Sequence, residues 1–278
     1  TNVKLNDMRK ILSFLMMCSL HLGLQSQTWH GDPDSVAALP SIGIQESSCT
    51  RITFEVVFPG FYSVEKREGN QVFQRISMPG CGSFGNLGEA ELPVLKKMIA
   101  VPEFSTANVA VKIKESETFD NYNIYPNPTY VVEELPEGGT YLVEAFAINN
   151  DYYSQNVSLP STHYVYSQDG YFRSQRFIEV TLYPFRYNPV RQEILFAKKI
   201  EVTITFDNPQ PPLQKNTGIF NKVASSAFIN YEADGKSAIE NDMVFSRGTT
   251  TYISGNVASN LPQNCDYLVI YDDMFNVN

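Results

Sequence analysis

The chain has 278 residues, of which 43% are hydrophobic and 13% aromatic, so it can bury a full core and is not disordered by composition. A net charge of −9 without any basic block excludes a nucleic-acid-binding protein, because such proteins need a positive face to displace counterions. No apolar run reaches the ~20 residues of a membrane span, so we do not expect an integral membrane protein.

The first residues have the layout of a secretory signal peptide. Met8-Arg9-Lys10 is a short basic start, the apolar run 11–24 follows, and Gln25-Ser26-Gln27 supplies a small residue for cleavage after Ser26. We therefore assign residues 1–26 to a leader and signal peptide and expect a secreted protein, with no membrane contact once the signal is removed. The alternative is a buried N-terminal helix.

The region 27–214 consists of strand-like segments with turn residues between them. Several short segments alternate apolar and polar residues with period two, and others are apolar runs of strand length. These segments are 51–58, 109–114, 141–148, 177–182 and 199–206. They predict an all-β domain, an antiparallel β-sandwich or a barrel-like fold. Asn188-Pro189 is the expected turn of a hairpin, and only 91–99 indicates a helical turn.

The chain changes character after residue 207. Prolines at 209, 211 and 212 close the strand region, and 215–263 is polar, with one apolar stretch, 223–231. We interpret that stretch as a docking helix or a short strand and the rest as a linker. The apolar run 265–273 ends in two acidic residues, which is typical of a buried parallel strand. Residues 264–278 therefore predict the start of a truncated α/β domain.

Three cysteines and two histidines remain after the signal peptide. Export permits a disulfide, for which Cys49 and Cys81 are the candidates because Cys265 lies far away, and the alternative is that all three are small buried hydrophobes. No cysteine spacing suits zinc and no glycine-rich loop suits a phosphate, so neither a metal nor a cofactor is expected. The residues alone show no catalytic apparatus.

Three stretches resemble, in order, the propeptide of the gingipain-type cysteine peptidases, which Bacteroidetes secrete. The first is 88–95 with 100–103, although Ala90 stands where the family has Pro. The second is Tyr187-Asn188-Pro189 with the strand after it, and the third is 227–232. Residues 266–270 then look like the first strand of the caspase-like catalytic domain.

The resemblance implies a zymogen whose β-rich propeptide assists folding and blocks its own downstream peptidase domain, its one expected partner. The catalytic Cys and His of that family lie beyond the first strand of the peptidase domain, so no catalytic residue is carried over to this chain. The fragment is then not catalytic itself, although its parent is a cysteine endopeptidase. The alternative from another class is a secreted β-sandwich module for adhesion or carbohydrate binding, in which the 16 Tyr and 18 Phe supply stacking platforms.

Two kinds of processing follow from the resemblance. Maturation requires cleavage within 233–264, where Lys236 and Arg247 are the basic residues, and we favour Arg247 because it lies in the middle of the polar linker. Asp34-Ser35-Val36 is similar to the O-glycosylation motif of exported Bacteroidetes proteins, so Ser35 is a candidate site.

The inhibitory segment should be exposed, extended and stiff, and 121–139, with Pro126, Pro128 and Pro136, fits best. Its candidate contact residues are Tyr130, Val131, Val132, Glu133, Glu134 and Leu135. No Lys or Arg occurs among them, so a peptidase that this segment mimics should prefer an apolar, aromatic or acidic residue. The alternative is an ordinary surface loop.

Overall fold

The computed structural model describes residues 27–135, 138–167, 170–173, 175–209 and 219–231. All of them belong to the first of two units, Thr1–Val244 and Phe245–Asn278. The predicted signal peptide, Lys236, Arg247 and the predicted strand 265–273 lie outside the described residues. Among the helices that are described, none has the length and apolar character to cross a membrane.

A first five-stranded sheet has the order β14-β15-β3-β2, with β8 on β15. Its strands are β2 (Ser41–Ser47), β3 (Arg51–Val57), β8 (Thr106–Phe119), β14 (Phe185–Asn188) and β15 (Glu193–Asp207). The period-two pattern of the sequence explains this sheet: Ile52, Phe54 and Val56 of β3 are fully buried, whereas the residues between them are partly exposed. The predicted hairpin is confirmed, since β14 pairs antiparallel with β15.

A second five-stranded sheet has the order β11-β13-β7-β6, with β12 on β13. Its strands are β6 (Gly82–Phe84), β7 (Leu92–Ala100), β11 (Tyr164–Tyr166), β12 (Gly170–Phe172) and β13 (Gln175–Leu182). The prediction of a helical turn at 91–99 is wrong, because β7 occupies this segment and pairs along both edges. Pro93 is accommodated because it precedes Leu95, where pairing with β13 begins.

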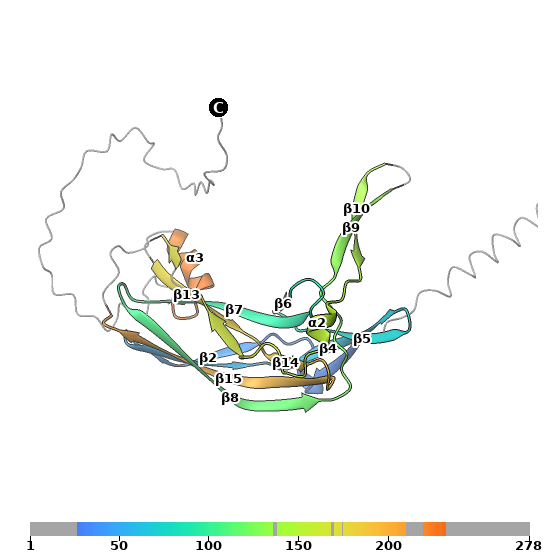
Figure 1. Ribbon diagram of the computed structural model, residues 1–278. Coiled ribbons are helices and arrows are strands. Elements are labelled where there is room, and N and C mark those ends of the chain that lie inside the picture. Colours follow the sequence, from blue (N-terminus) through green and yellow to red (C-terminus); the bar gives the residue numbers. More distant parts are fainter. Residues whose placement is uncertain (1–26, 136–137, 168–169, 174, 210–218, 232–278) are drawn as a thin grey trace, which may run out of the picture. The chain divides into compact units, whose positions relative to one another are not determined.

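The core lies between these two sheets and confirms the predicted all-β sandwich. Ile52, Val202 and Ile204 of the first sheet share one buried cluster with Ile178 and Leu182 of the second. A three-stranded sheet extends the core at one end, with strands β1 (Gln27–Gly31), β4 (Gly60–Glu68) and β5 (Gln71–Ser77). The short helices η2 (Pro33–Ser35) and α2 (Asn150–Tyr153) lie in the connections. Figure 1 shows the β7 layer over the β15 layer.

The segment that follows the last strand returns to the sheet as a helix and a short strap. Helix α3 (Ile219–Ala227) is followed by Phe228, which forms a parallel bridge with Met98 of β7. The side-chain amide of Asn230 then pairs with the backbone of Ala100: the Ala100 N–H donates to Oδ1 and Nδ2 donates to the Ala100 carbonyl, both at 2.9 Å. This strap buries Phe228 and Tyr231 in a second cluster with Ala100.

Candidate functional site

A two-stranded hairpin is the most exposed apolar element among the described strands. Its strands are β9 (Thr129–Glu134) and β10 (Thr140–Ala145), which form a sheet of their own and project from the sandwich in Figure 1. Soluble proteins rarely expose such surface without a partner. The large apolar side chains that are exposed on it are Tyr130, Val131, Val132, Leu135, Tyr141 and Leu142.

The two faces of the hairpin differ. Val132 pairs with Leu142, and these side chains, 64% and 67% exposed, lie on the same face as Tyr130 because opposite and alternate residues of a hairpin share a face. The other face carries Val131 and Tyr141, and there the Tyr141 hydroxyl donates a 2.7 Å hydrogen bond to Glu133. The apolar side chains on the face with Val132 are thus more exposed than those on the other face.

The tip of the hairpin closes on glycine. Gly138 and Gly139 have φ of +89° and +100°, a region that favours glycine, and the Leu135 N–H donates to the Gly139 carbonyl at 2.9 Å. Residues 129–145 contain four Glu, at 133, 134, 137 and 144, and no Lys or Arg. The surface of the hairpin is therefore apolar and acidic.

The root of the hairpin packs on three aromatic rings. Phe73 of β5 is buried, and its ring centroid lies 5.9 Å from that of Tyr125, before β9, and 5.4 Å from that of Phe146, after β10. The Tyr125 and Phe146 centroids are 5.8 Å apart. Since the two rings flank the two ends of the hairpin, this triangle joins both strands to β5.

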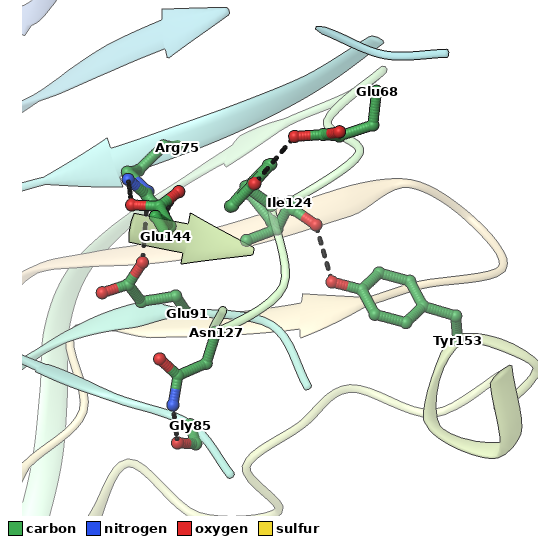
Figure 2. A network of polar contacts seen from close by, with 9 residues as sticks. Glu68, Arg75, Gly85, Glu91, Ile124, Asn127, Glu144 and Tyr153 are labelled. Carbon is green, nitrogen blue, oxygen red and sulfur yellow. Dashed lines mark hydrogen bonds and ion pairs between the residues drawn. The ribbon is translucent and has the colours of Figure 1, made fainter. Parts of the chain in front are cut away.

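Arg75, two residues after Phe73 on the same strand, clamps the root by charge (Figure 2). Its Nη1 and Nη2 donate to Glu144 of β10 at 3.0 and 2.8 Å, and its Nε lies 3.2 Å from Glu91 Oε2 in an ion pair. The guanidinium carbon is also 4.6 Å from the centroid of the Tyr125 ring. The hydrogen bonds from Arg75 hold the pKa of the Glu144 carboxyl below its usual range, although burial alone would raise that pKa.

Hydrogen bonds from side chains fix the segment 124–127 that leads into β9. The Tyr125 hydroxyl donates to Glu68 at 2.9 Å. Figure 2 shows two further bonds: the Tyr153 hydroxyl donates to the Ile124 carbonyl at 2.7 Å, and Asn127 Nδ2 donates to the Gly85 carbonyl at 2.7 Å. Burial, with the Glu68 contact, raises the pKa of Tyr125, so its hydroxyl stays a donor. The hairpin is thus a rigid projection from the sandwich.

The structure places all six predicted contact residues on one element, although that element differs from the predicted loop. Tyr130, Val131, Val132, Glu133 and Glu134 are strand residues of β9, and Leu135 begins the tip. The segment is exposed and extended, as predicted, but pairing with β10 gives it its stiffness in addition to proline. Leu142 on β10 lies in the predicted strand 141–148 but is not among the predicted contact residues.

The predicted disulfide between Cys49 and Cys81 is not formed in the structure. Both are free cysteines, and they pack against different clusters, Cys49 beside Phe228 and Cys81 against the main core. Burial raises the pKa of the Cys81 thiol to about 11, so this thiol matches the alternative of a small buried hydrophobe.

The other polar candidates have structural partners. Ser35 is half-buried in η2, and its hydroxyl donates to the Asp32 carbonyl at 2.8 Å. His30 bonds to Ser63 at 2.7 Å, and His163 bonds to the Tyr183 carbonyl at 2.9 Å, with the pKa of each histidine lowered by burial. No cluster of three His, Cys, Asp or Glu suited to a metal occurs in the part of the chain that the structure describes.

Comparison with known proteins agrees with this architecture. The family model Propeptide_C25 matches residues 25–239. Lys-gingipain of Porphyromonas gingivalis (strain ATCC 33277) is 24% identical over 211 residues, which cover 72% of this chain and 12% of that protein. The chain thus spans about an eighth of the length of the curated relatives it matches.

Two solved structures share the fold. One concerns the zymogenic latency of gingipain K from P. gingivalis, with a TM-score of 0.53 and 20% identity over 66% of this chain and 100% of that one. The other is a complex of the P. gingivalis RgpB pro- and mature domains, with a TM-score of 0.58 and 19% identity over 68% of this chain and 97% of that one. The chain therefore belongs to the Propeptide_C25 family, and its β-sandwich is a gingipain-type propeptide.

Proposed function

We propose that this propeptide inhibits a cysteine endopeptidase encoded after it in the same precursor, and that it assists the folding of that domain. Hairpin β9–β10 enters the active-site cleft and excludes substrate. The observation that carries the proposal is the exposed apolar face of Tyr130, Val132 and Leu142 on a hairpin whose root is fixed by Arg75 and Phe73. The complex of RgpB pro- and mature domains supports such a partner.

Inhibition rests on position. Pairing with β10 occupies one edge of β9 and holds its backbone, so the cleft receives a strand that cannot adjust toward attack geometry. A pre-ordered hairpin also loses little entropy on docking, which favours tight binding over that of a flexible loop.

Export and processing belong to the same proposal. The precursor is secreted through the periplasm after removal of residues 1–26, and Ser35 is modified outside the cytoplasm. Maturation cuts at Arg247 or Lys236, beyond Tyr231, whose packing with Phe228 keeps the strap on the propeptide side of the cut. Membership in a propeptide family disfavours the alternative of an adhesion or carbohydrate-binding module.

The test adds the purified chain to the separately expressed peptidase domain and follows hydrolysis of a peptide substrate. The proposal predicts stoichiometric inhibition that excess substrate relieves, and none by the heat-denatured chain. Full activity at saturating chain, with binding of the chain to polysaccharide instead, would contradict it.

A further inference from the structure

Phe104, in the turn between β7 and β8, combines two features that folded proteins usually avoid. Its side chain is 73% exposed, more than any other large hydrophobic residue among the described positions. Its φ is +54°, in the left-handed region, where a bulky residue is rare and strained. Glycine or asparagine adopts this backbone conformation with less strain, and a polar side chain is more favourable than Phe at a position so exposed to water.

The turn around Phe104 is nevertheless firmly built. Its neighbours Glu103 and Ser105 are 2% and 3% exposed. The Pro102 carbonyl accepts two hydrogen bonds of 2.8 Å, one from the Ser105 hydroxyl and one from Nη1 of the buried Arg176. Because the contacts on both sides fix the backbone, Phe104 is held outward and cannot fold back onto the sandwich.

A second exposed aromatic residue belongs to the same surface. Tyr171 of β12 is 59% exposed, and its hydroxyl donates to Glu103 Oε2 at 3.2 Å, next to Phe104 in the chain. We name Phe104 and Tyr171 the aromatic knob. Aromatic residues that are exposed on a rigid support are typical anchors of protein interfaces.

The position of the knob indicates what covers it. Tyr231, the last residue that the structure describes, packs with Ala100, four positions before Phe104 in the sequence. Residues 232–278 follow it, so the tether to a downstream peptidase starts at this end of β7. The hairpin root lies at the other end, where Glu91 precedes the strand (Figure 1).

The two surfaces are close enough for one partner. Strand β7 has nine residues, a length of about 30 Å. A domain of about 250 residues has a radius of gyration of about 18 Å and so a diameter above 40 Å. A peptidase domain that receives the hairpin is therefore wide enough to cover the opposite end of β7 as well.

We propose that the aromatic knob is a second docking point for the peptidase domain that follows this propeptide. This inference rests on the proposed function. Phe104 inserts into an apolar depression on that domain, away from its cleft, and holds the propeptide in the register that aims the hairpin. The same contact retains the propeptide after the linker is cut.

The test is Phe104→Gly in the full chain, measured against the separately expressed peptidase domain. Glycine removes the side chain and relieves the positive φ, so the unfolding midpoint should stay the same or rise. The inhibition constant should rise about tenfold or more, the usual effect of removing an aromatic anchor. Val190→Ala, at an exposed apolar position in the β14–β15 turn, is the matched control and should leave the inhibition constant unchanged.

A crosslinking variant gives an independent readout. Phe104→p-benzoylphenylalanine should form a photocrosslink to the peptidase domain, mapped to a peptide outside the active-site cleft. If Phe104→Gly inhibits as tightly as the wild type, or if position 104 crosslinks only to the propeptide itself, the second docking point is wrong. If the wild-type chain itself fails to inhibit, the proposed function fails first.

Discussion

Arg75 on β5 and Glu144 on β10 form a bidentate ion pair across 69 residues of sequence, with both N–O distances at or below 3.0 Å. Glu144 also pairs with Tyr130 in the hairpin ladder. The ion pair with Arg75 is therefore on the same face as Val132 and Leu142, at the root of the hairpin. The position of the proposed inhibitory surface is therefore set by a contact with the sandwich and by the fold of the hairpin together.

Replacing Arg75 with Gln should loosen the hairpin root, because Glu144 and Glu91 then lose the guanidinium that both of them contact. We expect a loss of about 1–3 kcal/mol of unfolding free energy and faster hydrogen exchange at Val131 and Val143. Urea unfolding and exchange measured by mass spectrometry check both.

The matched control is Lys198→Gln, which removes an exposed ion pair with Glu117 at 3.1 Å. This substitution should lower the free energy of unfolding by no more than about 1 kcal/mol and leave hydrogen exchange in the hairpin unchanged. Equal effects of the two variants would show that Arg75 has no special role at the root.

Replacing Asn230 with Ala should detach the strap from β7. The N–H and carbonyl of buried Ala100 would each lose a hydrogen bond, a cost of about 2 kcal/mol or more. Limited proteolysis should then cut near α3 earlier than in the wild type. Ser226→Ala, which removes only an exposed bond to the Val223 carbonyl, is the control and should behave as wild type.

Cys81 should resist alkylation in the native chain. With its pKa raised to about 11, about one thiol in a thousand is ionised at pH 8, and the thiolate is the reactive form. Iodoacetamide should therefore label Cys81 slowly at pH 8 and rapidly after denaturation, and a peptide map should show Cys49 and Cys81 both reduced. A peptide in which Cys49 is linked to Cys81 would contradict this prediction and support the disulfide.

The cognate peptidase should not prefer basic residues. Since residues 129–145 contain no Lys or Arg, a cleft that accepts this hairpin suits apolar, aromatic or acidic side chains. Fluorogenic peptides with Tyr, Val, Leu or Glu before the scissile bond should be cleaved at least about tenfold faster than those with Arg or Lys. The reverse order would mean that the hairpin does not mimic substrate.

The sandwich was predictable wherever one strand face meets the core. Ile52, Phe54 and Val56 alternate with polar residues, and the observed β3 follows from that pattern alone. Strand β7 was not predictable in the same way: Leu92, Leu95 and Ile99 have helical spacing, and only pairing with β13 and β6 makes the segment a strand. Tertiary contacts overrode local preference there.

The sequence indicated where the candidate site lies, but not the contacts that hold it to the sandwich. Prolines at 126, 128 and 136 and the apolar residues between them located the segment. Its root depends on Phe73 and Arg75, which are distant in sequence from the hairpin and carry no local pattern. Phe104 likewise looks ordinary in sequence, since neither its positive φ nor its exposure can be read from the residue type.

One measurement tests the central claim most directly. In a shortened variant, residues 131–143 are replaced by Asn-Gly, so that a tight turn joins Tyr130 to Glu144 and the Arg75 clamp is kept. The account predicts an unfolding midpoint close to that of the wild type and an inhibition constant at least about a hundredfold higher against the cognate peptidase domain. A folded shortened chain that inhibits as tightly as the wild type would contradict the account, because the hairpin would then have no part in latency.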